Sequence, residues 1–195
     1  MKYRKILIVL FAIILVVWLL LVFKANKKWE LKEPLIFSKG ETVEYGKDYY
    51  NSIEENRDGY FAVLKDAKIL TMEDFLKSQN LTENVFGSSS FIPKKVYLVE
   101  MEFHNADNTT GGINLVNMRL SCKSCVLEIS KELWSVMHPE LSGSLGFSLR
   151  ENSSKTLLLP YVFVDSAYET SRYDNLEWSL NLSQYPQKKI IAFNF

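Results

Sequence analysis

Two cysteines separated by two residues are the part of this 195-residue sequence best suited to chemistry. They are Cys122 and Cys125, in the stretch "SCKSC", and the chain has no other cysteine. Two thiols at this spacing can form a redox couple, supply half of a zinc site, close a tight structural disulfide, or remain unrelated. The elements around them decide among these four interpretations.

A redox couple of the thioredoxin type needs a helix N-terminus, because the helix dipole and the free amides there lower the pKa of the first thiol. The cysteine pair is instead followed by "VLEIS", which is rich in β-branched residues and typical of a strand. No βαβ pattern precedes it. An extracytoplasmic thiol-disulfide oxidoreductase is therefore the second hypothesis for function and not the first.

A zinc site would need the two cysteines together with the two histidines of the chain, His104 and His138. The alternating segments 96–104 and 113–121 predict a hairpin around "ADNTTGG", which would separate His104 from Cys122 by about 26 Å at roughly 3.3 Å per residue. We therefore expect no metal site. A local disulfide between the two cysteines, formed on an oxidising side of a membrane, is the favoured interpretation, with free thiols as the alternative.

The start of the chain indicates where these cysteines reside. Residues 6–23 form one apolar run of eighteen residues, about 27 Å long as a helix and so close to the thickness of a bilayer core. A cleaved export signal has a shorter apolar core and small residues at its cleavage site, whereas this run ends in Phe23-Lys24-Ala25. We predict an uncleaved transmembrane anchor over residues 6–23. Basic residues flank it on both sides: Lys2, Arg4, Lys5, Lys24, Lys27 and Lys28.

Because these flanking charges are balanced, the positive-inside rule does not orient the anchor. We expect a short cytoplasmic tail over residues 1–5 and an extracytoplasmic C-terminal part, since the run is similar to a lengthened export signal. A stalk and lead-in segment over residues 24–58 is expected to join the anchor to a folded domain over residues 59–195. The expected location is the cell membrane, crossed once.

Composition excludes some classes of partner. Residues 1–28 contain six of the 23 basic residues and none of the 23 acidic ones, so the remainder has a net charge of −6. Nucleic-acid-binding domains carry a basic face, and we therefore expect no nucleic-acid partner. The sequence has no nucleophile elbow, phosphate loop, metalloprotease helix or kinase motif, so we expect no catalytic residues and no cofactor.

Alternation of apolar and polar residues with a period of two predicts strands through most of the chain. It is clearest in "KKVYLVEMEFHN", where Tyr97, Val99, Met101 and Phe103 share one face. Further strands are predicted at 60–70, 113–121 and 126–130, in a hairpin over 143–164, and in a last pair over 175–183 and 188–195. Pro160 predicts an edge strand or a bulge within that hairpin. Short helices are predicted at 71–79, with Thr71 as N-cap, and at 131–138.

The segments "VYLVEMEFHN", "GGINLVNMRL" and "ENSSKTLLLPYVF" together resemble the telokin-like, immunoglobulin-fold domains of small Gram-positive surface proteins, many of them domains of unknown function. The resemblance covers residues 60–195 and implies an antiparallel immunoglobulin-like β-sandwich outside the membrane, with no catalytic residues. Many such proteins are lipoproteins, whereas no lipid-accepting cysteine follows the apolar run here. The predicted fold class is mainly β: this sandwich, one or two short helices, and one transmembrane helix before it.

The leading hypothesis is therefore a single-pass membrane protein that displays an immunoglobulin-like domain for binding or sensing at the cell envelope, with an unidentified envelope protein as partner. An accessory subunit of a membrane complex, such as a transporter, is a third hypothesis. We interpret the tyrosines of "EYGKDYYNSIEENRDGY" as ordinary strand-edge and linker residues, not as a binding surface. We interpret Asp165, Glu169 and Asp174 as part of a solvated loop and not as a calcium site.

Overall fold

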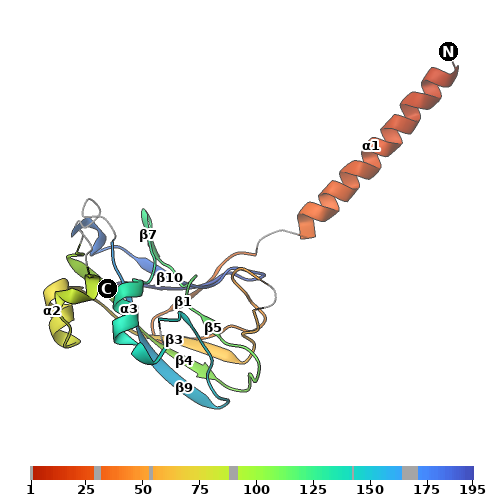
Figure 1. The fold of residues 1–195 in the computed structure, drawn as a ribbon. Helices are drawn as coiled ribbons and strands as arrows, with labels where there is room; N and C mark the ends of the chain where they lie inside the picture. The colour runs from red at the N-terminus through yellow and green to blue at the C-terminus, as the bar shows by residue number, and fades with distance from the viewer. Residues whose placement is uncertain (1, 29–31, 53–54, 88–91, 142, 164–170) are drawn as a thin grey trace. The chain divides into compact units, whose positions relative to one another are not determined.

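A computed structural model of the chain describes residues 2–28, 32–52, 55–87, 92–141, 143–163 and 171–195. The chain divides into two compact units, Met1–Lys32 and Glu33–Phe195. Helix α1 (Lys2–Lys28) makes up the first unit, and every strand that the structure describes belongs to the second (Figure 1).

Helix α1 confirms the predicted N-terminal apolar helix. Within it, Ile6–Lys27 is the one stretch of the described residues that is long and apolar enough to cross a membrane. Its most apolar window is not buried by protein, and large side chains such as Leu7, Phe11 and Trp18 are more than half exposed. The apolar residues surround the helix on all sides and do not form a single stripe, which is the pattern of a helix enclosed by apolar surroundings.

The second unit contains three described sheets. A five-stranded sheet has the order β1 (Leu35–Ser38), β11 (Lys189–Phe193), β10 (Trp178–Ser183), β6 (Leu120–Cys122) and β7 (Cys125–Leu127). A four-stranded sheet has the order β2 (Thr42–Glu44), β3 (Tyr60–Thr71), β4 (Lys95–Asn105) and β9 (Ser153–Tyr161). A small sheet pairs β5 (Ile113–Asn114) with β8 (Gly146–Phe147).

Strand β1 runs parallel to β11, and the other described pairs are antiparallel. Strand β9 lies at the edge of the four-stranded sheet, as Pro160 predicts, because proline has no N–H to donate to a further strand. The mainly β class, with several antiparallel sheets and few helices, is confirmed.

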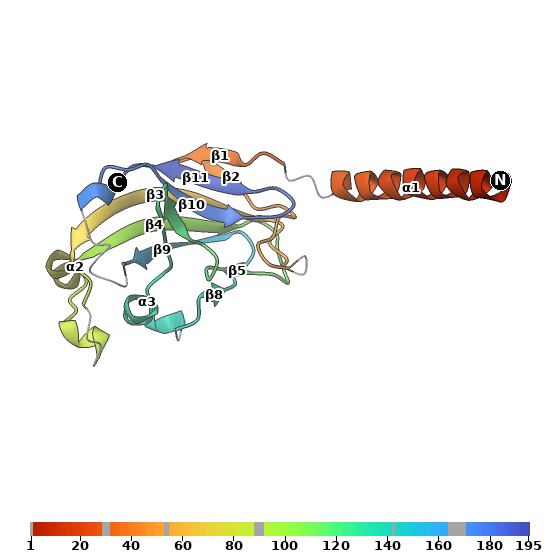
Figure 2. The same ribbon diagram turned by 90° about the horizontal axis from the view of Figure 1, so that it is seen from above.

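The two larger sheets face each other across one shared core (Figure 2). In β4, the predicted inner face of Tyr97, Val99, Met101 and Phe103 is at most 1% exposed. These side chains meet residues of the five-stranded sheet, and the ring centroids of Tyr97 and Trp178 lie 5.1 Å apart. Apolar burial of this kind is the main favourable contribution to folding. It fixes which face of each strand points inward.

Two short helices cover the opposite face of the four-stranded sheet near the start of β4. Phe75 of α2 (Met72–Ser78) and Leu133 of α3 (Lys131–Met137) belong to a second apolar cluster with Val96 and Leu98. Both faces of β4 are therefore buried in this region. The structure also describes three 3-10 helices, η1 (Glu83–Phe86), η2 (Pro139–Leu141) and η4 (Ser171–Tyr173).

Each of the two short α-helices, α2 and α3, begins at a side chain that satisfies a free backbone amide. Thr71 Oγ1 accepts a hydrogen bond from Asp74 N at 3.1 Å, and Ser130 Oγ accepts one from Leu133 N at 3.4 Å. Caps of this type stabilise a helix by about 1 kcal/mol. The prediction that Thr71 caps the first short helix is confirmed.

Strand pairing differs from two of the predicted hairpins. Segment 96–104 lies in β4, which pairs with β3 and β9 and not with 113–121. Within 113–121, β5 and the start of β6 join different sheets, and Val116 is 51% exposed whereas Met118 and Leu120 are buried. Likewise, β8 pairs with β5 and not with β9. Alternation reveals which face of a strand is buried, but it carries no information about a distant pairing partner.

The segment predicted as a stalk and lead-in contributes to the fold from Leu35 onward. Strands β1 and β2 each join a large sheet, and the second compact unit begins at Glu33, whereas the sequence placed the start of the domain at residue 59. Two tyrosines of "EYGKDYYNSIEENRDGY" are more buried than expected, since Tyr45 and Tyr60 are 1% and 0% exposed.

A buried arginine holds this segment against β10. Arg57 is 3% exposed; its Nη1 donates to the carbonyl of Leu182 at 3.0 Å and its Nη2 to Glu55 Oε2 at 2.6 Å. The guanidinium also lies over the ring of Tyr45, 5.1 Å from the centroid. Glu55 accepts hydrogen bonds from the backbone amides of residues 50–52. Because a buried charge is costly unless it is paired, this ion pair orders both the turn and its contact with the sheet.

Replacing Glu55 with Gln should lower the free energy of unfolding by about 1–2 kcal/mol near pH 7, since the amide keeps an acceptor oxygen but loses the charge that faces Arg57. Burial raises the pKa of Glu55, but the amide hydrogen bonds from residues 50–52 and the charge of Arg57 together outweigh burial, so its pKa lies below the ordinary value. The contribution of the ionised carboxylate is therefore complete above the ordinary pKa and is lost as the pH falls through the lowered one.

Denaturant unfolding of the full chain in detergent, repeated along a series of decreasing pH, measures this effect. The stability gap between the wild type and E55Q should close at acid pH. Glu151→Gln, at an exposed turn position, serves as the control and should change little. A gap that stays constant down to acid pH would contradict the role given to the ionised carboxylate.

Candidate functional site

The cysteine pair lies in the hairpin of β6 and β7, where Cys122 is directly opposite Cys125. Their Cα atoms are 5.2 Å apart, within the range that a disulfide spans, and the structure joins the two Sγ atoms. The neighbouring Ser121 pairs with Ser179 of β10, so the hairpin extends the five-stranded sheet. The hairpin geometry accommodates the predicted disulfide, whose formation in the cell stays a prediction.

The surroundings favour a structural bridge over a redox couple. Both cysteines belong to strands, and α3, the helix that follows them, begins only at Lys131. Neither thiol therefore lies in the first turn of a described helix, the position that generates a reactive thiolate of low pKa. The adjoining groove, with a volume of about 770 Å³, is lined mostly by apolar surface that includes Val126, Leu127 and Phe163.

The two histidines lie apart in the fold and have other partners. His104, on the exposed face of β4, lies beside Phe61 with ring centroids 6.1 Å apart. His138 packs against Trp134, and its Nε2 is 2.9 Å from the carbonyl of Leu158. Among the described residues, there is no group of three or more His, Cys, Asp or Glu side chains that could hold a metal ion.

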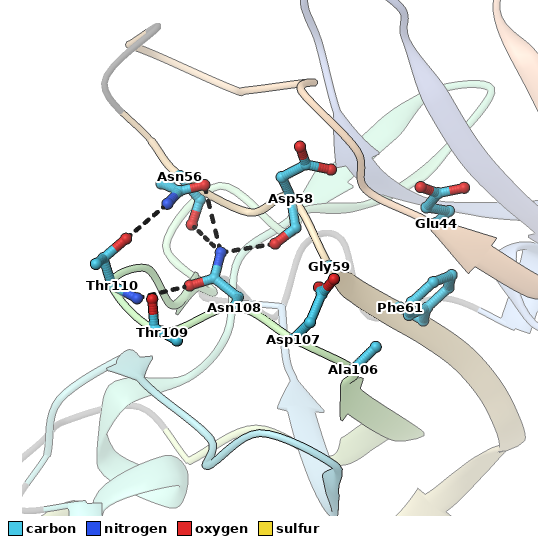
Figure 3. Close-up of a pocket in the computed structure, with 10 residues that line it drawn as sticks. All are labelled: Glu44, Asn56, Asp58, Gly59, Phe61, Ala106, Asp107, Asn108, Thr109 and Thr110. Atoms are coloured by element: carbon cyan, nitrogen blue, oxygen red, sulfur yellow. Dashed lines mark hydrogen bonds between the residues drawn. The ribbon is translucent and has the colours of Figure 1, made fainter.

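A second concave region lies where β2 and β4 end and β3 begins. It has a volume of about 430 Å³ and is formed by the turn that leads into β3 and by the loop that follows β4. Its lining residues are Glu44, Asn56, Asp58, Gly59, Phe61, Ala106, Asp107, Asn108, Thr109 and Thr110 (Figure 3). We refer to it as the polar pocket.

Asn108 builds the polar pocket by joining its two loops. Its Nδ2 donates to the carbonyl of Asp58 at 2.6 Å, while its Oδ1 accepts from the amide of Thr110 at 3.1 Å (Figure 3). The same Oδ1 accepts from the amide of Gly111 at 2.5 Å. The side chain is only 8% exposed and uses both ends of its amide group. An aspartate could accept the hydrogen bonds from the amides of Thr110 and Gly111. It could not donate one to the carbonyl of Asp58, so the position needs an amide.

Close packing of backbone against backbone also shapes the polar pocket. Gly59 has a φ of +81°, and a Cβ there would lie 2.1 Å from Asp107 Oδ1 and 3.2 Å from the amide of Asn108. At Gly111, a Cβ would lie 1.7 Å from the carbonyl of Asn56. Only glycine fits either position, because other residues would collide with the opposite loop.

The polar pocket has an acidic lining. Glu44, Asp58 and Asp107 each border it with a carboxylate, and none of the lining residues is basic. Phe61 adds one aromatic side chain from β3. Such a surface accepts hydrogen bonds and attracts positive charge.

Sequence reasoning did not identify the polar pocket, because "ADNTTGG" indicates a turn but not which loop that turn meets. The six residues predicted to flank a membrane fall within α1, and their role at a membrane stays a prediction: Lys2, Arg4, Lys5, Lys24, Lys27 and Lys28. Of the carboxylates weighed for calcium, Asp174 pairs with Lys95, whereas Asp165 and Glu169 lie outside the described residues.

These features define a mainly β domain with two facing sheets, preceded by an apolar helix. The chain belongs to the family described as a domain of unknown function, DUF5028, whose model matches residues 35–189. Among solved structures, it is similar to a functionally unknown protein from Listeria monocytogenes EGD-e, with 13% sequence identity, a TM-score of 0.47, and coverage of 80% of this chain and 88% of the other. No curated protein matches the chain. The expectation of an unknown-function domain is confirmed.

Replacing Cys122 with Ser should lower the free energy of unfolding by about 2 kcal/mol or less, because a disulfide that closes so short a loop removes little entropy from the unfolded chain. Dithiothreitol should destabilise the wild type by the same amount and leave the variant unchanged. Denaturant unfolding, with thiol alkylation and mass measurement to record the oxidation state, tests both statements. Equal sensitivity of the two proteins to the reductant would contradict a structural disulfide.

Proposed function

We propose that this chain is a single-pass membrane protein of a Gram-positive cell envelope, whose β domain is displayed outside the membrane to bind or sense an envelope partner. The observation that carries the proposal is helix α1: its stretch Ile6–Lys27 is long enough to span a bilayer and is not buried by protein. At about −0.3 to −0.6 kcal/mol for each central Leu, Ile, Val or Phe, the run favours insertion by several kcal/mol.

One feature supports an extracytoplasmic domain. The cysteines face each other across a hairpin at a Cα separation of 5.2 Å, and such a pair is preserved as a disulfide on the oxidising side of a membrane. The net charge of −6 after residue 28 favours solubility of the domain on either side.

We further propose that the domain is a variant of the immunoglobulin-like sandwich. Nine strands in two facing sheets support this proposal, since variable-type immunoglobulin domains also have nine. The strand order is a departure: β3 and β4 are consecutive in the chain and adjacent in one sheet. In an immunoglobulin domain, the adjacent strands B and E of the corresponding sheet are not consecutive.

The polar pocket is the surface that we propose for binding. Asp58 and Asp107 belong to the loops that Asn108 joins, and Glu44 is the last residue of β2, so all three carboxylates are presented by hydrogen-bonded backbone. Ordered loops lose little entropy when a partner binds. The acidic lining favours a partner that presents amines or hydroxyl groups.

Labelling of intact cells tests the topology. In a Cys122→Ser, Cys125→Ser background, Lys77→Cys on α2 should react with a membrane-impermeant maleimide without lysis, whereas Tyr3→Cys should react only after lysis. Both positions are exposed in the folded chain. The opposite pattern would place the domain in the cytoplasm and refute the proposed display.

Photo-crosslinking in living cells tests the binding role. A photoreactive amino acid at Thr109, an exposed residue of the polar pocket, should yield a discrete crosslinked species, and the same amino acid at Lys77 should not. Asp107→Asn and Asp58→Asn, introduced together, should weaken the Thr109 crosslink because they remove two of the three carboxylates. Equal crosslinking at both sites, or none, would count against the polar pocket as the binding surface.

A further inference from the structure

The outer face of the four-stranded sheet is open near the end of β4. Near the start of β4, the helices α2 and α3 cover this face at Val96 and Leu98. Glu102 and His104 belong to the same face, because side chains an even number of residues apart point the same way along a strand, and His104 is exposed. A concave region of about 460 Å³, which we call the sheet groove, lies there. It is lined by Thr42, Phe61, Val63, Glu102, His104, Ala106 and Ser154.

The strand register aligns four side chains in one row across all four strands. Glu44 of β2 is opposite Phe61 of β3, and Phe61 is opposite His104 of β4. His104 in turn is opposite Ser154 of β9. Three spacings of about 4.8 Å between strands make the row about 14 Å long. In its middle, the ring centroids of Phe61 and His104 lie 6.1 Å apart. The row therefore has a carboxylate at one end, a hydroxyl group at the other and two flat rings between them.

The sheet groove and the polar pocket join at Phe61. Both are lined by Phe61 and Ala106, so they form one continuous surface. Glu44, at the end of the row, is also one of the three carboxylates of the polar pocket. Figure 3 shows Phe61 and Glu44 together at the end of the polar pocket away from Thr110. The acidic pocket thus continues into a surface of hydroxyl groups and aromatic rings.

We propose that this continuous surface binds an envelope polysaccharide that carries free amino groups. The inference rests on the proposed function and deepens it, since it names the class of partner. Sugar hydroxyl groups donate and accept hydrogen bonds, and they match the carboxylates and hydroxyl groups of the row. The C–H groups of a sugar ring fit against the electron-rich face of an aromatic ring such as that of Phe61. Protonated amino groups form charge-assisted hydrogen bonds with the carboxylates of the polar pocket.

A polysaccharide fits this surface better than a basic peptide does. A peptide that binds by strand addition needs a free sheet edge, whereas β3 and β4 each have a neighbouring strand on both sides. An amphipathic helix needs an apolar groove, whereas Phe61 is the single purely apolar side chain of the row. A chain of sugar rings needs neither, because its own hydroxyl groups supply the hydrogen bonds.

Calorimetric titration of the full chain in phosphatidylcholine nanodiscs tests the inference. The probes are an oligomer of glucosamine, the same oligomer fully N-acetylated, and oligolysine of equal length. Zwitterionic lipid does not attract the cationic probes, and empty nanodiscs give the background. Physiological ionic strength screens long-range attraction. The glucosamine oligomer should bind, and the acetylated oligomer should bind several-fold more weakly because it lacks the charged amines.

Phe61→Leu should weaken binding of the glucosamine oligomer several-fold, since leucine keeps apolar bulk but offers no ring face. Phe86→Leu is the matched control, because Phe86 is also partly buried but packs against the second apolar cluster. Denaturant midpoints show that both variants fold. Asp58→Asn and Asp107→Asn, introduced together, should reduce the preference for the charged oligomer over the acetylated one.

Failure of both sugar oligomers to bind, with the Thr109 crosslink still formed in cells, would overturn the inference and leave the proposed function standing. Loss of that crosslink as well would remove both. Oligolysine that binds as tightly as the glucosamine oligomer would assign the surface to a basic peptide and overturn the inference. Equal effects of Phe61→Leu and Phe86→Leu would overturn it too, because the row would then not be the site.

Discussion

An apolar run of eighteen residues, whose most apolar window is not buried by the described protein, is the constraint on which the account of this molecule depends. Exposed to water, the apolar side chains would cost the chain several kcal/mol relative to a bilayer, which is the reason for proposing a membrane anchor. The proposed anchor brings the domain to a membrane surface. It also makes the redox state of the Cys122–Cys125 hairpin a property of the side on which the domain lies.

The domain itself is stabilised by contacts that the segment before β3 makes with the end of β10 and the start of β11. Arg57 ties the segment before β3 to the carbonyl of Leu182, while Lys189 pairs with Asp48 and donates to the carbonyl of Glu44. These pairs join residues far apart in the chain. Because β1 and β2 are thereby part of the sheets, the connection to the helix is short.

The sequence predicted those parts of the fold that depend on local pattern. Alternation predicts the inner face of β4. The cap at Thr71 follows because a hydroxyl accepts hydrogen bonds from free amides, and the edge position of Pro160 follows because proline has no N–H. Pairings between distant segments, such as β5 with β8, could not be predicted, since one sequence contains no signal for a partner. The polar pocket depends in the same way on Asn108 meeting the turn before β3, a contact across fifty residues of chain.

The intact mass of the protein extracted from the membranes of cells that express the chain is the most direct test of its central property. An uncleaved anchor predicts that the species found in the membrane fraction has the mass of the full chain, 22.6 kDa. It also predicts that this species stays with the membranes after washing with alkaline carbonate. A shorter species in the soluble fraction, beginning beyond residue 28, would show that the helix is an export signal and would contradict a tethered domain.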